Sequence, residues 1–92
     1  MPDATPLEAS PIEYPVDFPI KVMGRNQPGF EHTVTSIVQR HAPDFDPATM
    51  ELRPSRKNTY LSLTCIVNAR SREQLDALYT ELSAHPMVVM VL

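Results

Sequence analysis

The sequence predicts one small α+β domain, and three features lead to that fold class. Apolar residues alternate with polar ones at about residues 17–24 and 59–69, the pattern of strands with one buried face. Two other stretches, at about 28–42 and from Ser71 onward, carry one apolar stripe at helical spacing. With two shorter strands the element order is βαββαβ, and two helices can cover only one face of a four-stranded antiparallel sheet. The predicted architecture is therefore a ferredoxin-like two-layer sandwich with two helices on one face and an open sheet on the other.

The chain of 92 residues divides into a tail and a domain. Residues 1–16 are proline-rich, acidic and without periodicity, so we expect a disordered tail there and a folded domain over 17–92. Split after Asp17, the first part carries four acidic residues and no Lys or Arg, whereas residues 18–92 carry 8 − 7 = +1. A nearly neutral domain lacks the strongly basic balance of a nucleic-acid binder, so no nucleic-acid partner is predicted.

Targeting and membrane signals are not visible in the sequence. No apolar run approaches about 20 residues, so no membrane span is expected. The N-terminus shows no basic segment followed by an apolar run, which a signal peptide would need. Cys65 is the single cysteine, so it has no partner for an intrachain disulfide. We therefore expect a cytoplasmic protein.

The first strand and the first helix are expected to meet in a sharp junction. The strand at about 17–24 is predicted to stop at Gly24. Asn26 is predicted to cap the helix, and Pro28 to lie in its first turn, where a missing N–H costs nothing. Pro43 should end the helix, because proline disfavours the helical conformation of the residue before it. The apolar stripe of this helix consists of Phe30, Val34, Ile37, Val38 and His41.

The remaining elements follow from turn and cap signals. The second strand is expected at about 49–53, and Asn58 should take a left-handed turn conformation before the third strand. Ser71 with Gln74 three residues later is a capping-box pattern that opens the second helix. Met87–Leu92 is continuously apolar and is predicted to be the fourth strand. The buried face of the third strand is predicted to be Leu61, Leu63, Cys65, Val67 and Ala69.

The predicted topology gathers basic residues at one end of the sheet. The loop after the first strand, the connection between the second and third strands, and the loop before the fourth strand all lie at that end. Backbone N–H groups at a helix start, with Arg and Lys nearby, favour a small anion or carboxylate, although solvated loop charges explain the same pattern. The candidate ligand-binding residues are Gly24, Arg25, Asn26, Pro28, Gly29, Arg56 and Lys57.

The open face of the predicted sheet is the second candidate site. It is more apolar than a fully solvated face would be, and the apolar fourth strand lies at an edge, where backbone groups pair easily. A protein partner or a second copy of the chain is therefore expected on the face or at the edge. The candidate interaction surface is Lys21, Met23, Tyr60, Ser62, Thr64 and Ile66.

Residues 18–92 resemble the YbeD-like family of small bacterial proteins. The resemblance rests on Lys21-Val22-Met23-Gly24, on Val38–Pro43 and on Pro54-Ser55 with Lys57 and Tyr60, together with Leu78–Leu82 and Met90-Val91-Leu92. It implies a ferredoxin-like domain similar to the ACT regulatory domain, with no established activity and a link to lipoate attachment through gene neighbourhood only. The sequence departs from the family pattern at Asn58, where glycine is usual, at Val89, where some members are polar, and in its long tail.

The similarity to ACT domains has a local carrier. Asn26-Gln27-Pro28-Gly29-Phe30 resembles the turn that opens the first helix of those domains, where an amino acid binds at a dimer interface. This resemblance implies that Asn26, Pro28 and Gly29 contact a ligand, whereas the same residues also serve as an ordinary turn.

Other chemistries fit the sequence poorly. A phosphoryl-transfer loop like that of acylphosphatase would not place Glu31 and His32 directly after Phe30, because a carboxylate repels the phosphoryl group. RNA-recognition domains stack bases on several aromatic residues of the open face, and here Tyr60 stands alone. The histidines and Cys65 are dispersed, so no metal or cofactor is expected. The sequence therefore predicts a non-enzymatic regulatory module that binds a small carboxylate or anion, with a protein-interaction adaptor as the alternative.

Overall fold

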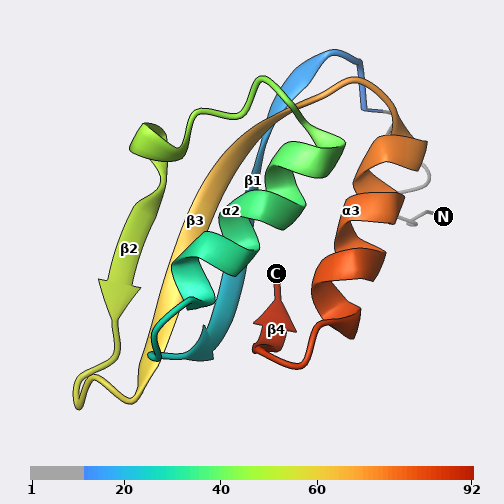
Figure 1. Ribbon diagram of the computed structural model, residues 1–92. Helices are drawn as coiled ribbons and strands as arrows, with labels where there is room; N and C mark the ends of the chain where they lie inside the picture. Colours follow the sequence, from blue (N-terminus) through green and yellow to red (C-terminus); the bar gives the residue numbers. More distant parts are fainter. Residues whose placement is uncertain (1–11) are drawn as a thin grey trace, which may run out of the picture.

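The sheet has four antiparallel strands in the order β2-β3-β1-β4, so β1 and β3 are central. The computed structural model describes residues 12–92, and most of the predicted tail lies outside the described residues. Both helices cover the same face of the sheet (Figure 1). The ferredoxin-like βαββαβ prediction is thereby confirmed. The elements are β1 (Val16–Arg25), α2 (Phe30–His41), the 3₁₀ turn η1 (Pro47–Thr49), β2 (Glu51–Pro54), β3 (Tyr60–Ala69), α3 (Arg72–Ala84) and β4 (Val88–Val91).

The core lies between the sheet and the helices, and its residues come from the predicted faces. Every second residue of β3 from Leu61 to Ala69 is buried, and Ile20 and Val22 of β1 lie beside them. The helix α2 buries four of the five residues in its predicted stripe, while His41 is only partly buried. The helices contribute Phe30, Val34, Ile37, Val38, Leu75, Leu78 and Leu82 to the core.

The junction between β1 and α2 differs from the prediction. Gly29, with φ 88° and ψ −12°, precedes the first helical residue Phe30, and no side chain caps the helix. The Phe30 N–H donates to the Gln27 carbonyl at 3.2 Å, with Pro28 and Gly29 between them in the order of a type II turn, which requires a positive φ at its third residue. Asn26 therefore is not the cap and Pro28 is not in the first helical turn. The Asn26 N–H instead donates to the Thr59 carbonyl at 2.9 Å.

The sequence predicted that the first strand stops at Gly24, and this is wrong, because β1 continues to Arg25. Gly24 is buried where β1 passes under the first turn of α2. A Cβ at this position would lie 2.4 Å from the Met87 carbonyl oxygen and 2.5 Å from the Phe30 ring. The glycine is therefore needed for close packing of strand, helix and the chain that leads into β4.

Pro19 lies within the central strand β1, a position that a proline normally avoids because it cannot donate to the ladder. The strand β4 is shorter than predicted and spans Val88–Val91, with Leu92 bonded to Lys21 at 3.0 and 2.8 Å. Since backbone groups alternate along a strand, Pro19 points toward the same side as Lys21, beyond the end of β4. The nitrogen of Pro19 therefore faces a side of β1 that has no neighbouring strand at this point in the described residues, so no hydrogen bond is lost there.

Two other local predictions are refined by the structure. The second strand begins at Glu51 rather than Thr49, because η1 precedes it and Asp46 accepts from the Ala48 N–H at 3.0 Å. At α3, Ser71 accepts from the Gln74 N–H at 3.1 Å, which confirms that half of the capping box. The Gln74 side chain instead accepts from the Arg70 N–H at 2.6 Å and donates to the His41 carbonyl at 2.8 Å, so it joins the ends of both helices.

Candidate functional site

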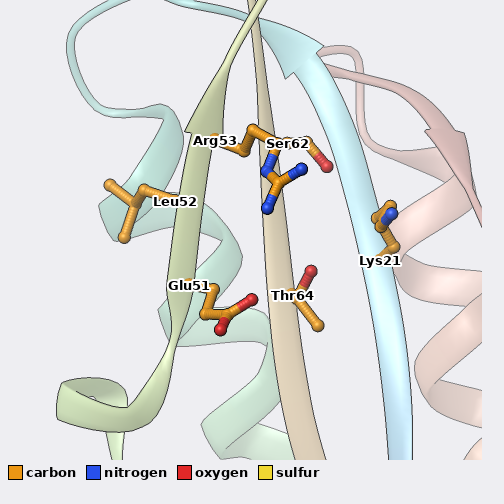
Figure 2. Close-up of a pocket in the computed structure, with 6 residues that line it drawn as sticks. All are labelled: Lys21, Glu51, Leu52, Arg53, Ser62 and Thr64. Atoms are coloured by element: carbon orange, nitrogen blue, oxygen red, sulfur yellow. The ribbon is translucent and has the colours of Figure 1, made fainter.

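A concavity of about 400 Å³ lies on the open face of the sheet, over β2, β3 and β1. Ser62 and Thr64 of β3 form its floor, and Lys21 of β1 forms one wall. Figure 2 shows Arg53 reaching from β2 over β3 toward Ser62, and the Glu51 carboxylate lying between β2 and β3. We call these five residues the open-face concavity.

The strand register explains why a hollow forms there. Ser62 pairs with Arg53 on one side and Met23 on the other, so a short side chain lies between two long ones. Thr64, the next residue of β3 on the same face, pairs with Glu51 and Lys21 in the same way. Directly opposed residues share one face of the sheet, so the small hydroxyl residues lie lower than the charged residues beside them. The side chain of Leu52, which follows the other parity, points away from Glu51 and Arg53 (Figure 2).

The charges at this face differ from those on the helices in having no ion-pair partner. Within residues 12–92, all four ion pairs involve bases that precede, end or begin a helix: Arg40 and His41 with Glu81, Arg70 with Asp44, and Arg72 with Asp76. Five of the eight Lys and Arg residues have no carboxylate within 4 Å in that range, and they lie on the open face and the adjacent loops. These five are Lys21, Arg25, Arg53, Arg56 and Lys57.

The open face also carries uncovered apolar side chains. Tyr60 and Ile66 of β3 are 42% and 43% exposed, and Met90 of β4 is 46% exposed. Met90 pairs with Met23, so both lie on the open face beside the polar concavity. The open face therefore carries exposed apolar side chains on β3 and β4 around the polar concavity.

The predicted loop site is an exposed surface rather than a hollow. The structure brings two of its loops together, since Asn26 bonds to Thr59 and Arg25 pairs with Tyr60. Asn58 has φ 60°, which confirms the predicted left-handed turn. Of the candidate residues there, Gly24 is buried by packing. The other six are exposed: Arg25, Asn26, Pro28, Gly29, Arg56 and Lys57.

Sequence reasoning named three residues of the concavity and missed two. Lys21, Ser62 and Thr64 belonged to the predicted interaction surface. Glu51 and Arg53 were named in neither of the two predicted sites. The alternation of Met50 and Leu52 toward the helices already placed Glu51 and Arg53 on the opposite face.

Other reactive groups are engaged in the fold. Cys65 is completely buried, and burial raises the pKa of its thiol to about 11. Desolvation also raises the pKa of Tyr79, whose hydroxyl donates to the Leu92 carbonyl at 3.4 Å. His41 contacts the Glu81 carboxylate at 2.7 Å. In the part of the chain that the structure describes, no three His, Cys, Asp or Glu residues are grouped so that they could hold a metal ion.

The fold and the open sheet define a ferredoxin-like domain, and solved structures that include an ACT domain share this fold. The ACT domain from GTP pyrophosphokinase of Chlorobium tepidum superposes with a TM-score of 0.64 at 18% identity, over 84% of this chain and 97% of that one. Protein HP0495 from H. pylori gives a TM-score of 0.74 at 14% identity, over 99% and 98% of the two chains. At these identities the similarity establishes the fold alone.

Sequence comparison then places the chain in a family. The family described as "Protein of unknown function (DUF493)" matches residues 9–92. A UPF0250 protein of Nitrosomonas europaea is 60% identical over 92% of this chain and 98% of its own length. A UPF0250 protein of Janthinobacterium is 53% identical over the full length of both chains. The chain belongs to the DUF493 family of UPF0250 proteins, which agrees with its YbeD-like resemblance. Within residues 12–92, no helix is both long and apolar enough to cross a membrane.

Proposed function

We propose that the protein is a non-enzymatic regulatory module that binds a small carboxylate or similar anion in the open-face concavity. The observation that carries the proposal is that Lys21 and Arg53, which have no ion-pair partner in the described residues, line the same hollow as the hydroxyl groups of Ser62 and Thr64. Arg presents a fork of donors that matches a carboxylate, and hydroxyl groups supply further donors. The ACT-like fold supports a regulatory role for such a ligand.

Glu51 restricts the ligands that would fit this site. Its carboxylate lies in the same wall as Arg53 and repels an anion with several charges. A ligand with one carboxylate and a separate hydrogen-bond donor could bind Arg53 through the carboxylate and Glu51 through the donor. The site therefore favours small carboxylates over polyphosphates.

The proposal is tested by titrating the ¹⁵N-labelled full chain with acetate, succinate, free amino acids and lipoate while recording amide chemical shifts. We expect shifts centred on Lys21, Arg53, Ser62 and Thr64. Arg53→Gln should weaken binding about ten-fold or more, since a charge-assisted hydrogen bond contributes about 1.5–3 kcal/mol. The matched variant Arg56→Gln, at the hairpin tip, should leave the affinity unchanged.

The outcomes separate the two predicted locations. Shifts centred on Asn26–Gly29, with loss of affinity in Arg56→Gln rather than Arg53→Gln, would move the site to the loop end. Absence of binding across the panel at millimolar concentrations would reject the ligand proposal.

The uncovered apolar side chains of the open face favour a second candidate function, a protein-interaction adaptor. Tyr60→Glu or Ile66→Lys would then abolish capture of a protein partner or self-association, whereas Arg53→Gln would not. A partner that binds both variants equally well would exclude the open face as its docking surface.

A further inference from the structure

We propose that the N-terminal segment, residues 1–11, docks on the open face of its own domain and competes there with any anionic ligand. The segment lies outside the described residues, and the argument rests on its composition and on the surface it can reach. It contains Asp3 and Glu8, no Lys or Arg, and the apolar residues Met1 and Leu7. It is therefore an acidic peptide with apolar anchors.

The open face matches that composition in both charge and apolarity. Lys21, Arg25 and Arg53 have no carboxylate partner in residues 12–92, and Glu51 is the single acidic residue of the concavity. Beside them, the exposed side chain of Met90 pairs with Met23. The face of the sheet thus offers positive charge next to an apolar strip, which complements carboxylates interspersed with Met and Leu.

The helical side of the molecule does not match the segment. Its bases Arg40, Arg70 and Arg72 are already paired with carboxylates, and its apolar stripes are buried in the core. An acidic segment gains little there, because each contact would replace an existing ion pair. The unpartnered positive charge of the described chain is on the open sheet and its adjoining loops.

The length of the segment allows this docking. Residues 1–11 can extend over roughly 37 Å at about 3.3–3.6 Å per residue. From Val16, where β1 begins, to Met23 is a path of about 24 Å along the strand at roughly 3.4 Å per residue. Tyr14 and Pro15 form a bend directly before β1, and Tyr14 packs against the core, so the segment leaves the domain on the helix side and has to pass the edge of the sheet to reach the open face.

Attachment to the same chain favours docking in cis over docking on another copy. Attachment through a short stretch of chain gives an effective concentration on the order of millimolar, well above the micromolar concentrations at which a second copy competes. A contact of only millimolar intrinsic affinity is then populated within one chain. Such a weak contact is readily displaced by a ligand, and this gives the acidic segment a regulatory effect on the concavity.

Paramagnetic relaxation in the full chain tests the docking without any ligand. A nitroxide is attached at Thr5→Cys, and Cys65 does not react because its thiol is completely buried with a raised pKa. We expect loss of amide signal at Lys21, Ser62 and Thr64 and retention at His32 on α2. The loss should be reversed at high salt, which screens exposed charges.

Two charge reversals provide the matched control. Arg53→Glu should restore the open-face signals, whereas Lys57→Glu, the same change at the hairpin tip, should leave the loss in place. Asp3→Asn combined with Glu8→Gln, which removes both negative charges of the segment, should also restore the open-face signals. Loss of signal spread evenly over both faces, or a pattern unaffected by Arg53→Glu, would overturn the proposal.

A mixed sample separates cis from trans docking. Spin-labelled chain at natural isotope abundance is mixed with unlabelled ¹⁵N chain. We expect no open-face signal loss in the ¹⁵N chain at micromolar concentration. Loss in this sample as strong as in the single-chain experiment would mean that the segment binds a second copy, and the proposal of docking in cis would be wrong.

Discussion

At the scale of single residues, the two glycines of the chain serve different purposes although both flank the β1–α2 junction. Gly24 is required for space, because a Cβ would meet the Met87 carbonyl and the Phe30 ring. Gly29 is required for its conformation, because its φ of 88° is rarely adopted by other residues, while the space around it is open.

Substitution separates these two requirements. Gly24→Ala should destabilise the protein by about 3 kcal/mol, the upper range for inserting a methyl group into packed surroundings. Gly29→Ala should cost about 1 kcal/mol, and Gly29→Asn less, because asparagine tolerates the left-handed region. Urea unfolding of the three variants measures both effects. Equal losses in Gly24→Ala and Gly29→Ala would contradict the packing role of Gly24.

Cys65 gives a pH dependence whose sign follows from its burial. The pKa of the thiol is raised from 9.0 to about 11 in the folded protein, so the thiol form is favoured by folding. Its contribution is complete below about pH 9 and is lost as the pH rises through about 11. We expect unfolding free energy to fall by roughly 2–3 kcal/mol over this interval, on the basis of 1.36 kcal/mol per pKa unit.

The matched variant Cys65→Ala should be less stable at neutral pH but should show a shallower decline above pH 9. Urea midpoints measured from pH 8 to 11 report the slope. Tyr79, whose pKa is also raised, contributes a decline of the same sign and remains in both proteins. An unchanged slope in Cys65→Ala would show that the thiol does not titrate in that range.

At the scale of elements, β1 is a central strand over one part of its length and an edge strand over the other. Lys21 exchanges two backbone bonds with Leu92, whereas Pro19 lies past the end of β4. Pro19 and the acidic Asp17 therefore occupy the part of β1 that other chains could approach, and both residue types discourage pairing there. The other edge, β2, is protected similarly by Glu51, Arg53 and Pro54.

Proline should therefore be tolerated at position 19 and not at position 21. Lys21→Pro removes the N–H that donates to the Leu92 carbonyl and leaves that carbonyl unpaired. The substitution should lower the free energy of unfolding by about 1–3 kcal/mol or more. Pro19→Ala should cost less than about 1 kcal/mol, mostly through the greater freedom of the unfolded chain. Chemical unfolding compares the two. A small loss in Lys21→Pro would mean that β4 does not pair with β1 in solution.

At the scale of the whole molecule, the sequence predicted the layers well because they follow from periodicity. The alternation in β3 and the stripe of α2 specify buried faces, and two helices can cover only one face of the sheet. Local details failed where one residue type serves several structures. Asn26 and Pro28 fit a helix start as well as a turn, and the structure has the turn, with Phe30 packed close over Gly24.

Periodicity also predicted part of the candidate site. Lys21, Ser62 and Thr64 follow from alternation within their own strands. Alternation in β2 also places Glu51 and Arg53 on the open face, but their positions opposite Thr64 and Ser62 depend on the register between β2 and β3, which no local pattern in the sequence specifies. The exposed loop residues are close together in the topology as expected, but the hollow itself is a property of strand pairing.

Figure 1 shows α2 in front of the central strands β3 and β1, with β2 standing to the side. All four residues of β2 are exposed, and even Leu52, which shares the helix-side face with buried Leu63, is 46% exposed. A strand with so few buried contacts opens locally at a small fraction of the global free energy of unfolding. The amides of β2 should therefore exchange with solvent far sooner than those of β1. One wall of the concavity then belongs to the least protected strand of the sheet, so occupancy of the hollow is coupled to ordering of this strand.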